Sequence, residues 1–555
     1  MGSDRMAGVS AASSRPDSPG VTNRSASDST AGQEELDAPG ASGAPALPGS
    51  LAAPVRPAPG LGILLAFLAS GAVLTLELLG LRLVAPYVGL TIQANSAVIG
   101  MALGGIAAGV WLGGQLADAR DPRLLLGPVF LVSGALTVLM LPLVRLLGES
   151  IGSTNPAVVL LMAMVAVFFP SAALSAVPPL VVKQMLADLR LTGSTVGLVS
   201  AAGTIGGLVA TFVTGFLLVT YFPVRGLVLT IAAILLVVGV ALTVRNRSAR
   251  RTGQRSVVTP VLVVAALAVG GLSLAETPRC EVETAYHCAR LVSAAPPAGA
   301  LTLHLDTLSH SYVNQADPTD LRFAYIRAMA AVSNAVAPPG APITALHIGG
   351  GGATMPRYLA ATRPGTHSTV FEVDRGVVSL DKKRLGLRTS DTLKVRVVDG
   401  RVGLHQSPTD VDDLVIGDAF GGVSVPWHLT TRETAREVRR VLKPNGIYAV
   451  NVIDYPPNRF AAAEYATLAS TFADVGVMAA PTSLQNRTGG NFVLVASDAP
   501  LPVDSLRAGL RDHPQGWQLL TGPEAAGWAG ANGTPLVLTD DYAPVDQILT
   551  QPSVG

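Results

Sequence analysis

The sequence has few charged residues for its length and no strong excess of either sign. Only 14% of its 555 residues are charged, whereas 49% are hydrophobic. This balance excludes a wholly soluble protein and indicates a membrane part joined to a soluble part. The formal net charge is +1, and the soluble half has no basic stripe interleaved with aromatic residues. Nucleic acid is therefore not an expected partner.

Cysteine is almost absent. Cys280 and Cys288, the two cysteines of the chain, are too few to form a zinc site alone, and we expect no metal. They follow the last long apolar segment, in RCEVETAYHCARL. In an oxidising compartment a pair this close could form a small local disulfide, and otherwise the two are unrelated thiols.

The first 58 residues lack the branched and aromatic side chains that a core needs. They are dominated by Ala, Gly, Ser, Pro and Asp, so residues 1–58 are predicted to be a disordered tail. The first long apolar run begins only at Leu61, and the start does not have the pattern of a signal peptide. That run is expected to stay in the mature protein.

Residues 59–276 are predicted to form a multi-pass α-helical membrane domain of about seven helices. Each apolar segment approaches the roughly 20 residues that a helix needs to cross a bilayer core, so the lipid bilayer is an expected partner. Small residues recur in MALGGIAAGVWLGG and SAAGTIGGLVATFVTG, which favours close helix packing. The segments lie near residues 61–81, 96–117, 124–147, 156–182, 194–221, 225–244 and 257–275.

Basic residues in the loops predict the orientation. A cytoplasmic tail places nine basic residues in the inner loops and three in the outer loops. The inner ones are Arg120, Arg123, Lys183, Arg190, Arg245, Arg247, Arg250, Arg251 and Arg255, and the outer ones are Arg82, Arg145 and Arg225. With seven crossings the C-terminal half is extracytoplasmic, and a helix count that differs by one reverses this conclusion.

The C-terminal half reads as an α/β fold. Residues 277–340 are predicted to hold a small β region, in ARLVSA and LTLHLDTLSHSYVN, and a lead-in helix. Residues 341–555 then alternate strand and helix patterns, which predicts a Rossmann-like, doubly wound and largely parallel sheet. Ligands of such sheets bind beyond the carboxyl ends of the strands.

The ends of these predicted strands carry glycine and three acids. Gly349, Gly350 and Gly351 belong to a four-glycine turn after the first strand, where the backbone can approach a ligand closely. Thr354 stands where the dinucleotide fingerprint has its last glycine, which counts against a site for NAD.

The three acids suit a nucleoside. Glu372 ends the second strand and can accept hydrogen bonds from both ribose hydroxyls. Asp399, followed by Gly400, ends the third strand and can accept from an adenine amino group, and Asp418 ends the fourth, beside the reacting end. Each acid alone could instead be a helix cap or a solvated loop residue.

Several motifs carry a family resemblance that covers about residues 60–550. IGGGGATMPRYL, FEVD, VVDG, LVIGDAF and VLKPNG resemble the nucleoside core of spermidine synthases, which transfer aminopropyl from decarboxylated S-adenosylmethionine to putrescine. The helices and the terminal LTDDYAPVDQIL resemble bacterial fusions of a major-facilitator-like membrane part with a spermidine-synthase-like domain. The resemblance implies a methyltransferase-type fold and an aminopropyltransferase that takes a nucleoside and a polyamine.

The resemblance also implies site residues, with departures. Asp418 matches the first acid of the family's catalytic loop, but Gly421 replaces the second acid, which holds and deprotonates the amine. Gly352 replaces the acid of the family's glycine loop, and the family's diamine-binding acidic pair has become Asp317-Pro318.

Other residues are candidates for the amine site. His310 and Tyr312 lie where the resemblance puts the floor of the substrate pocket, although a lone His is more often structural. Trp427 and His428 either line the pocket or pack against the core. The candidate substitutes for the missing acids are Asp306, Tyr312, Asp317, Asp540 and Asp541.

Two classes of function follow, and a third uses the same core. The first is a membrane-anchored aminopropyltransferase, and the second is a catalytically silent protein that binds a polyamine or a nucleoside. The third is a methyltransferase that uses S-adenosylmethionine. The amine, the oligomeric state and any transported solute stay open.

Overall fold

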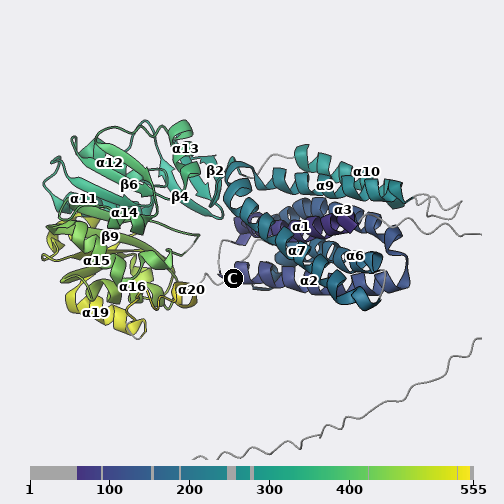
Figure 1. The fold of residues 1–555 in the computed structure, drawn as a ribbon. Helices are drawn as coiled ribbons and strands as arrows, with labels where there is room; N and C mark the ends of the chain where they lie inside the picture. Colours follow the sequence, from purple (N-terminus) through teal and green to yellow (C-terminus); the bar gives the residue numbers. More distant parts are fainter. Residues whose placement is uncertain are drawn as a thin grey trace, which may run out of the picture. The chain divides into compact units, whose positions relative to one another are not determined.

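The structure is a computed structural model that describes residues 59–88, 92–151, 156–186, 189–246, 258–275, 280–294, 296–422, 424–533 and 536–550 (Figure 1). The predicted tail, residues 1–58, lies outside the described residues. So do four of the predicted inner-loop arginines, Arg247, Arg250, Arg251 and Arg255.

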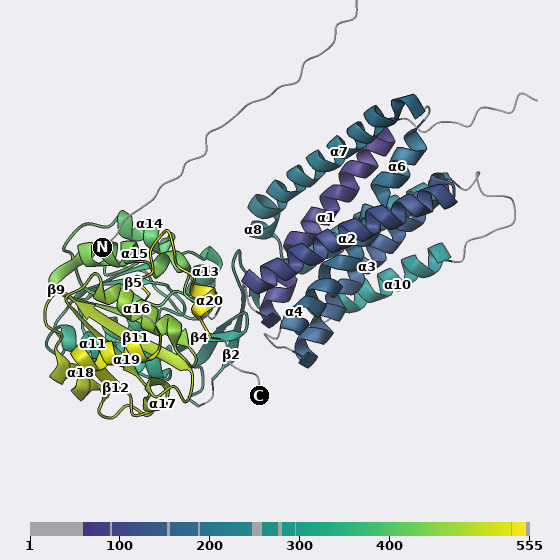
Figure 2. The same ribbon diagram turned by 90° about the horizontal axis from the view of Figure 1, so that it is seen from below.

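The first part of the chain is helical, and Figure 2 shows its long helices lying beside one another. Two of the long helices contain a short π-helical segment, η1 or η3. The elements are α1 (Pro59–Val88), α2 (Ile92–Ala119), α3 (Pro122–Ile151), α4 (Pro156–Ala163), η1 (Met164–Phe168), α5 (Phe169–Ser175), α6 (Val177–Met185), η2 (Leu189–Leu191), α7 (Thr192–Val213), η3 (Thr214–Leu218), α8 (Val219–Tyr221), α9 (Val224–Arg245) and α10 (Val258–Ala275).

Six spans among the described residues are long and apolar enough to cross a membrane. They run over Gly60–Val88, Ile92–Ala119, Pro122–Ser150, Ala157–Met185, Thr192–Tyr221 and Val224–Arg245. The segment predicted as a seventh crossing forms α10, within which Val263–Ser273 is a shorter apolar helix. The seventh crossing therefore stays a prediction.

Glycines bring the helix backbones into contact, as the repeated small residues predict. A Cβ atom added to Gly109 of α2 would lie 2.1 Å from the carbonyl oxygen of Ala172 in α5. A Cβ added to Gly206 of α7 would lie 2.3 Å from the carbonyl oxygen of Phe67 in α1. Larger side chains at these positions would force the helices apart.

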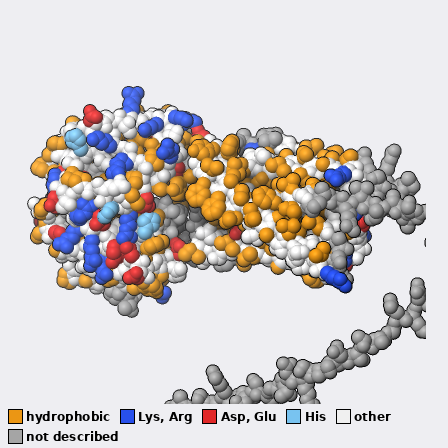
Figure 3. Space-filling view, in the orientation of Figure 1, with side chains coloured by type: hydrophobic (Ala, Val, Ile, Leu, Met, Phe, Trp, Pro, Cys, Tyr) orange, Lys and Arg blue, Asp and Glu red, His pale blue; other side chains and the backbone are white. Residues whose placement is uncertain are grey.

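The outward faces of the helices are apolar. In Figure 3 hydrophobic side chains cover most of the visible helical surface, whereas charged side chains gather over the α/β part. Trp111, Phe216 and Leu267 are each more than half exposed, at 64%, 73% and 65%. Exposed apolar faces of this extent are typical of contact with lipid.

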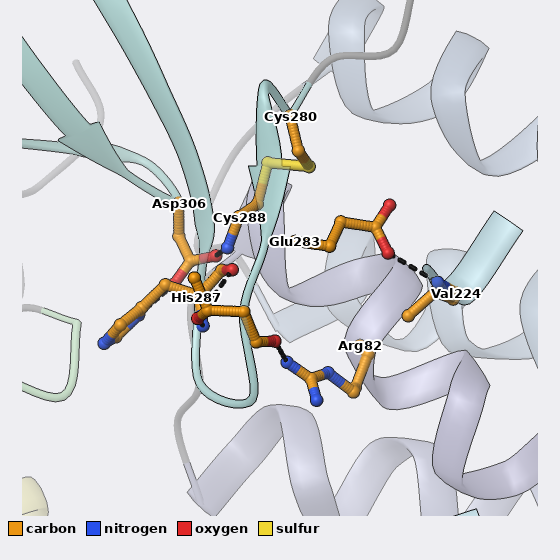
Figure 4. Close-up of a disulfide and its surroundings, with 8 residues drawn as sticks. Arg82, Val224, Cys280, Glu283, His287, Cys288 and Asp306 are labelled. Carbon is orange, nitrogen blue, oxygen red and sulfur yellow. Dashed lines mark hydrogen bonds and ion pairs between the residues drawn. A yellow bond between two sulfur atoms is a disulfide. The ribbon is translucent and has the colours of Figure 1, made fainter. Parts of the chain in front are cut away.

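A small antiparallel sheet follows the helices. Its strands are β1 (Val282–Glu283), β2 (Cys288–Ser293), β3 (Leu301–Leu305) and β4 (Leu308–Val313), in the order β1-β2-β3-β4. A disulfide joins Cys280 to Cys288 at the base of the β1–β2 hairpin (Figure 4). Glu283 of this hairpin accepts a hydrogen bond from the backbone N–H of Val224, and Arg82 donates to the carbonyl of Thr284.

The second sheet has eight strands in the order β12-β10-β11-β9-β8-β5-β6-β7. The strands β7, β6, β5, β8 and β9 are parallel, whereas β11 is antiparallel to β9 and to β10, and β12 is antiparallel to β10. The strands are β5 (Thr344–Ile348), β6 (His367–Glu372), β7 (Leu393–Val397), β8 (Asp412–Gly417), β9 (Leu442–Asp454), β10 (Asp474–Ala479), β11 (Gly490–Ser497) and β12 (Gln518–Thr521). This is a Rossmann-like sheet of the methyltransferase type, which confirms the predicted fold class.

Helices cover both faces of this sheet, because alternate side chains of each strand point to opposite faces. Leu346 and Ile348 of β5 pack with α14 (Gly400–His405), α15 (Arg432–Val441), α16 (Arg459–Ala469) and α19 (Gly522–Ala531). Ala345 of β5 packs on the other face with α11 (Ala324–Val336), α12 (Thr354–Thr362) and α18 (Val503–Leu510). The remaining elements are α13 (Arg375–Arg384), η5 (Trp427–Leu429), α17 (Pro481–Leu484) and α20 (Val545–Ile548).

The order β6-β5-β8 marks the point where the chain reverses direction across the sheet. From β5 the chain first adds β6 and β7 on one side and then returns to add β8 and β9 on the other. Crevices form beyond the carboxyl ends of the strands at such a switch point.

Candidate functional site

A cavity of about 970 Å³ lies at the carboxyl ends of the parallel strands. Most of the predicted site residues line it together, although they come from four different strand ends and from the small sheet. These are His310, Gly349, Gly350, Gly351, Glu372, Asp399, Gly400 and Asp418.

The glycine turn begins at position 349, where both the backbone conformation and the lack of space for a Cβ atom require glycine. Its φ angle is +100°, and an added Cβ would lie 2.2 Å from the carbonyl oxygen of Asp418. The Gly349 N–H donates to the carbonyl oxygen of Phe371 at 2.9 Å. The turn is therefore fixed between the ends of β6 and β8, with its backbone open to the cavity.

The end of the same turn leaves no room for a side chain. The N–H of Gly352 donates to Ser311 Oγ at 2.9 Å. A Cβ at Gly352 would lie 2.6 Å from Val313 Cγ2. An acid at this position, as in the glycine loop of spermidine synthases, would require β4 to shift.

Glu372 lies directly against the glycine turn. Its Oε2 accepts hydrogen bonds from the N–H groups of Gly350 at 2.7 Å and Gly351 at 3.3 Å, and its Oε1 accepts from the N–H of Asp374 at 2.8 Å. Burial raises the pKa of Glu372, and the backbone donors oppose that shift. This carboxylate and the turn thus form one polar end of the cavity.

Asp399 has two roles at the end of β7. Its Oδ1 caps α14 by accepting from the N–H groups of Arg401 at 2.9 Å and Val402 at 3.2 Å, as in the helix-cap alternative. Its Oδ2 lies 3.0 Å from Nε2 of His428. Both Asp399 and His428 line the cavity.

Asp418 is held by amide side chains. Asn451 Nδ2 donates to Asp418 Oδ1 at 2.9 Å, and Asn491 Nδ2 donates in turn to Asn451 Oδ1 at 3.0 Å. Burial raises the pKa of Asp418 to about 6, and the Asn451 and Tyr325 side chains oppose the shift. At neutral pH the group is therefore mainly a carboxylate with an orientation set by Asn451, which suits a proton acceptor.

Gly421, which replaces the second acid, lies in open space. An added Cβ would meet no heavy atom within 4 Å, and the residue lines the cavity. Its N–H donates to the carbonyl oxygen of Ser424 at 2.9 Å. The backbone here could therefore carry a larger side chain without a clash.

His310 belongs to a pair of histidines beside the cavity. Burial, together with the neighbouring His287, lowers the pKa of His310 to about 4. The His287 Nδ1 lies 2.7 Å from Asp306 Oδ2. Burial alone would lower the pKa of His287, but the hydrogen bond and charge of Asp306 outweigh it and raise the pKa. His310 is thus a neutral wall residue, whereas Asp306 favours the protonated form of His287.

Several predicted residues do not line the cavity. Tyr312 donates through its hydroxyl to Asp320 Oδ2 at 2.7 Å, and Asp317 is exposed and accepts from the Thr319 N–H at 2.9 Å. Asp541 lines a separate pocket together with Trp427. Their predicted roles at the amine site stay predictions.

Two more of the proposed substitute acids have other partners. Asp306 faces His287, and Asp540 accepts from Arg401 Nη1 at 2.6 Å and from Thr431 Oγ1 at 2.8 Å. In the part of the chain that the structure describes, no group of three or more His, Cys, Asp or Glu side chains could hold a metal.

Sequence reasoning did not find Asn451, Asn491, Tyr325 and His287. Asn451 is a buried polar residue inside the otherwise apolar run GIYAVNVI. That pattern was a usable signal, because a buried amide needs a hydrogen-bond partner. Nothing in the local sequence singles out His287 or Asn491.

Comparison with known proteins gives one curated relative. No protein-family model matches the sequence. The chain is 29% identical over 175 residues to a polyamine aminopropyltransferase of Vibrio vulnificus, a match that covers 31% of this chain and 57% of that protein. The match thus spans little more than half of the relative's length.

Solved structures are also similar to the chain. A probable spermidine synthase from Corynebacterium glutamicum is 24% identical, with a TM-score of 0.44, and the match covers 50% of this chain and all of that one. A spermidine synthase in complex with the transition state analogue AdoDATO is 16% identical, with a TM-score of 0.31, and covers 46% of this chain and 87% of that one. By sequence, the chain is similar, at modest identity and over part of its length, to a polyamine aminopropyltransferase.

Proposed function

We propose that this chain is a membrane-anchored aminopropyltransferase that uses decarboxylated S-adenosylmethionine and an amine acceptor. The observation that carries the proposal is the gathering of the glycine turn, Glu372, Asp399 and Asp418 around one cavity. The order of these groups along the sheet edge matches the order of parts in an adenosyl donor.

The nucleoside occupies the β7-β6-β5 end of the cavity. Glu372 accepts from the ribose hydroxyls, Asp399 accepts from the adenine amino group, and the glycine turn lets the donor approach the backbone. These contacts hold the sulfonium carbon near Asp418 and so replace a bimolecular encounter by a positioned attack.

The chemical step takes place beside Asp418. The acceptor nitrogen attacks the carbon next to the sulfonium, a C–N bond forms, and the C–S bond breaks with its electron pair going to sulfur. The leaving group is a neutral thioether, and the proton of the acceptor amine passes to the Asp418 carboxylate.

The helices anchor this enzyme in a membrane, in a membrane part that resembles the major-facilitator type. In the proposed topology the N-terminal tail is cytoplasmic and the C-terminal α/β domain is extracytoplasmic. The Cys280–Cys288 disulfide supports this side, because disulfides persist in oxidising compartments.

The proposal is tested by titrating the full chain, in detergent, with decarboxylated S-adenosylmethionine and with its methylthio product in a calorimeter. We expect binding of both, at least about tenfold weaker in Glu372→Ala, since two ribose hydrogen bonds are lost. Product analysis with an amine acceptor should show an aminopropylated amine. Absence of nucleoside binding, or binding that Glu372→Ala leaves unchanged, would refute the proposal.

A catalytically silent binding protein is the second candidate, and Gly421 is the observation that favours it. In that case the nucleoside binds but no amine is modified. Methyl transfer from S-adenosylmethionine, detected as a methylated product, would instead indicate a methyltransferase.

A further inference from the structure

The cavity continues past Asp418, and this second half differs in chemistry from the first. Along the sheet edge, β8 is followed by β9, β11 and β10. The cavity residues from this side include Asn451 at the end of β9, Asn491 at the start of β11 and Thr482 after β10. We call this group, with the other lining residues beyond β8, the acceptor half.

Among the residues that the structure describes, the acceptor half has no carboxylate of its own. Its described lining residues are amides, hydroxyls and apolar groups, namely Asn451, Ile453, Ala480, Pro481, Thr482, Ser483, Thr488, Asn491, Gln515 and Trp517. Asp418 stands at its inner end and is the acid that the reacting amine needs. A second ammonium in the same acceptor would find no opposite charge there.

The nearby Arg322–Asp320 ion pair does not supply a free carboxylate either. Arg322 also lines the cavity, and its Nε donates to Asp320 Oδ1 at 2.8 Å. The other oxygen of Asp320 accepts from Tyr312 at 2.7 Å and from Asn314 at 3.2 Å. The Asp320 carboxylate is thus engaged by Arg322, Tyr312 and Asn314, and it is not free to pair with a second ammonium.

None of the acids predicted as substitutes supplies the carboxylate that the acceptor half lacks. Asp306, Asp317, Asp540 and Asp541 are all absent from the residues that line this cavity. Gly421 leaves the second acid position empty, although the space for a side chain is there. Neutral polar groups therefore surround the part of an acceptor that lies beyond its reacting amine.

From this arrangement we infer that the acceptor carries a single amine on a neutral, hydrogen-bonding body, such as an amino alcohol or an amino amide, and is not a diamine. This inference rests on the proposed aminopropyl transfer. A lone ammonium removed from water without a carboxylate is strongly disfavoured, whereas a hydroxyl or amide can pair with Asn491 or Thr482.

The test compares acceptors of one length. The full chain in detergent, supplied with decarboxylated S-adenosylmethionine, is assayed with 4-amino-1-butanol and with 1,4-diaminobutane. We expect kcat/KM to be at least about tenfold higher for the amino alcohol. A preference for the diamine would overturn the inference and leave the proposed function intact. Turnover of neither acceptor, despite nucleoside binding, would overturn both.

A pair of variants tests whether the absence of charge causes the proposed acceptor preference. Gly421→Asp adds a carboxylate where nothing obstructs it, and we expect it to move the preference at least about tenfold towards the diamine. Gly421→Asn adds a side chain of similar size without charge, and should keep the preference of the natural chain. Equal effects of both variants would show that size rather than charge sets the preference, which overturns the inference.

Discussion

Asp418 owes its position to amides rather than to another charge. Asn451 donates to it and is itself held by Asn491, so the carboxylate has one orientation without a cation that would weaken it as a base. Its raised pKa of about 6 lies close to neutral pH, where a general base works best.

The first prediction concerns this carboxylate. Asp418→Asn should lower kcat/KM about 10²- to 10⁴-fold, the range for general-base catalysis, while nucleoside affinity stays within about twofold. In the natural chain kcat/KM should rise as the pH passes upward through about 6, because Asp418 must lose its proton to act. Rate profiles from pH 5 to pH 8 check both expectations, and a loss of nucleoside binding in the variant would contradict them.

The second prediction concerns the His287–Asp306 pair. The folded-state pKa of His287 is raised above 6.5. The pair therefore stabilises the fold fully below the unfolded pKa, and this contribution is lost as the pH rises through the folded pKa. Thermal unfolding of the natural chain and of His287→Gln should differ more at pH 6 than at pH 9. A difference that grows with pH would contradict the pairing.

For single residues, the sequence predicted the glycines and the three acids of the cavity but not their hydrogen-bond partners. Glu372, Asp399 and Asp418 could be found because each ends a strand, and strand ends meet at one edge. His287 could not be found, because its place at the cavity follows from how the small sheet packs. Asp317 and Asp541 were selected as possible substitutes for the acids that the family resemblance implies, and neither is among the residues that line the cavity.

Among the structural elements of the site, the glycine turn is expected to tolerate substitution least. Gly349 combines a positive φ angle with a neighbour 2.2 Å from any added Cβ. A third prediction follows: Gly349→Ala should weaken nucleoside binding at least about tenfold and lower the midpoint of thermal unfolding, since both backbone strain and a clash are introduced.

Gly421→Ala is the matched control for stability. Its added Cβ meets nothing within 4 Å, so the midpoint of thermal unfolding should stay unchanged. Equal loss of stability in the two variants would mean that the close approach of Gly349 to Asp418 does not constrain the fold.

The parallel part of the sheet was predictable and the antiparallel part was not. The predicted strand and helix segments between residues 343 and 453 correspond to β5–β9 and to α12, α13 and α15, because apolar strands there alternate with helical patterns, whereas the short α14 was not predicted. The strands β10 and β11 are buried almost throughout. A strand that is apolar on both faces reads the same in either direction, so its orientation leaves no trace in the sequence.

Across the whole molecule, hydropathy located the helices well but left their number open. Within the described ranges, six spans are long and apolar enough to cross a membrane, and α10 follows as a further helix. The side of the membrane on which the α/β domain lies depends on that one helix.

A fourth prediction uses the two cysteines to test on which side of the membrane the α/β domain lies. An impermeant maleimide added to intact cells should label the chain only after reduction, because the Cys280–Cys288 disulfide protects both thiols and the domain is proposed to lie outside. Cys288→Ser should be labelled at Cys280 without reduction. Labelling that requires opened cells would place the domain in the cytoplasm.

The contact of Gly349 with the carbonyl of Asp418 has a kinetic consequence. A donor bound at the glycine turn contacts backbone that packs directly against the backbone of Asp418. The turn and Asp418 therefore cannot move independently. The donor site and the base therefore share one piece of backbone, so a change in the turn should lower turnover together with donor affinity.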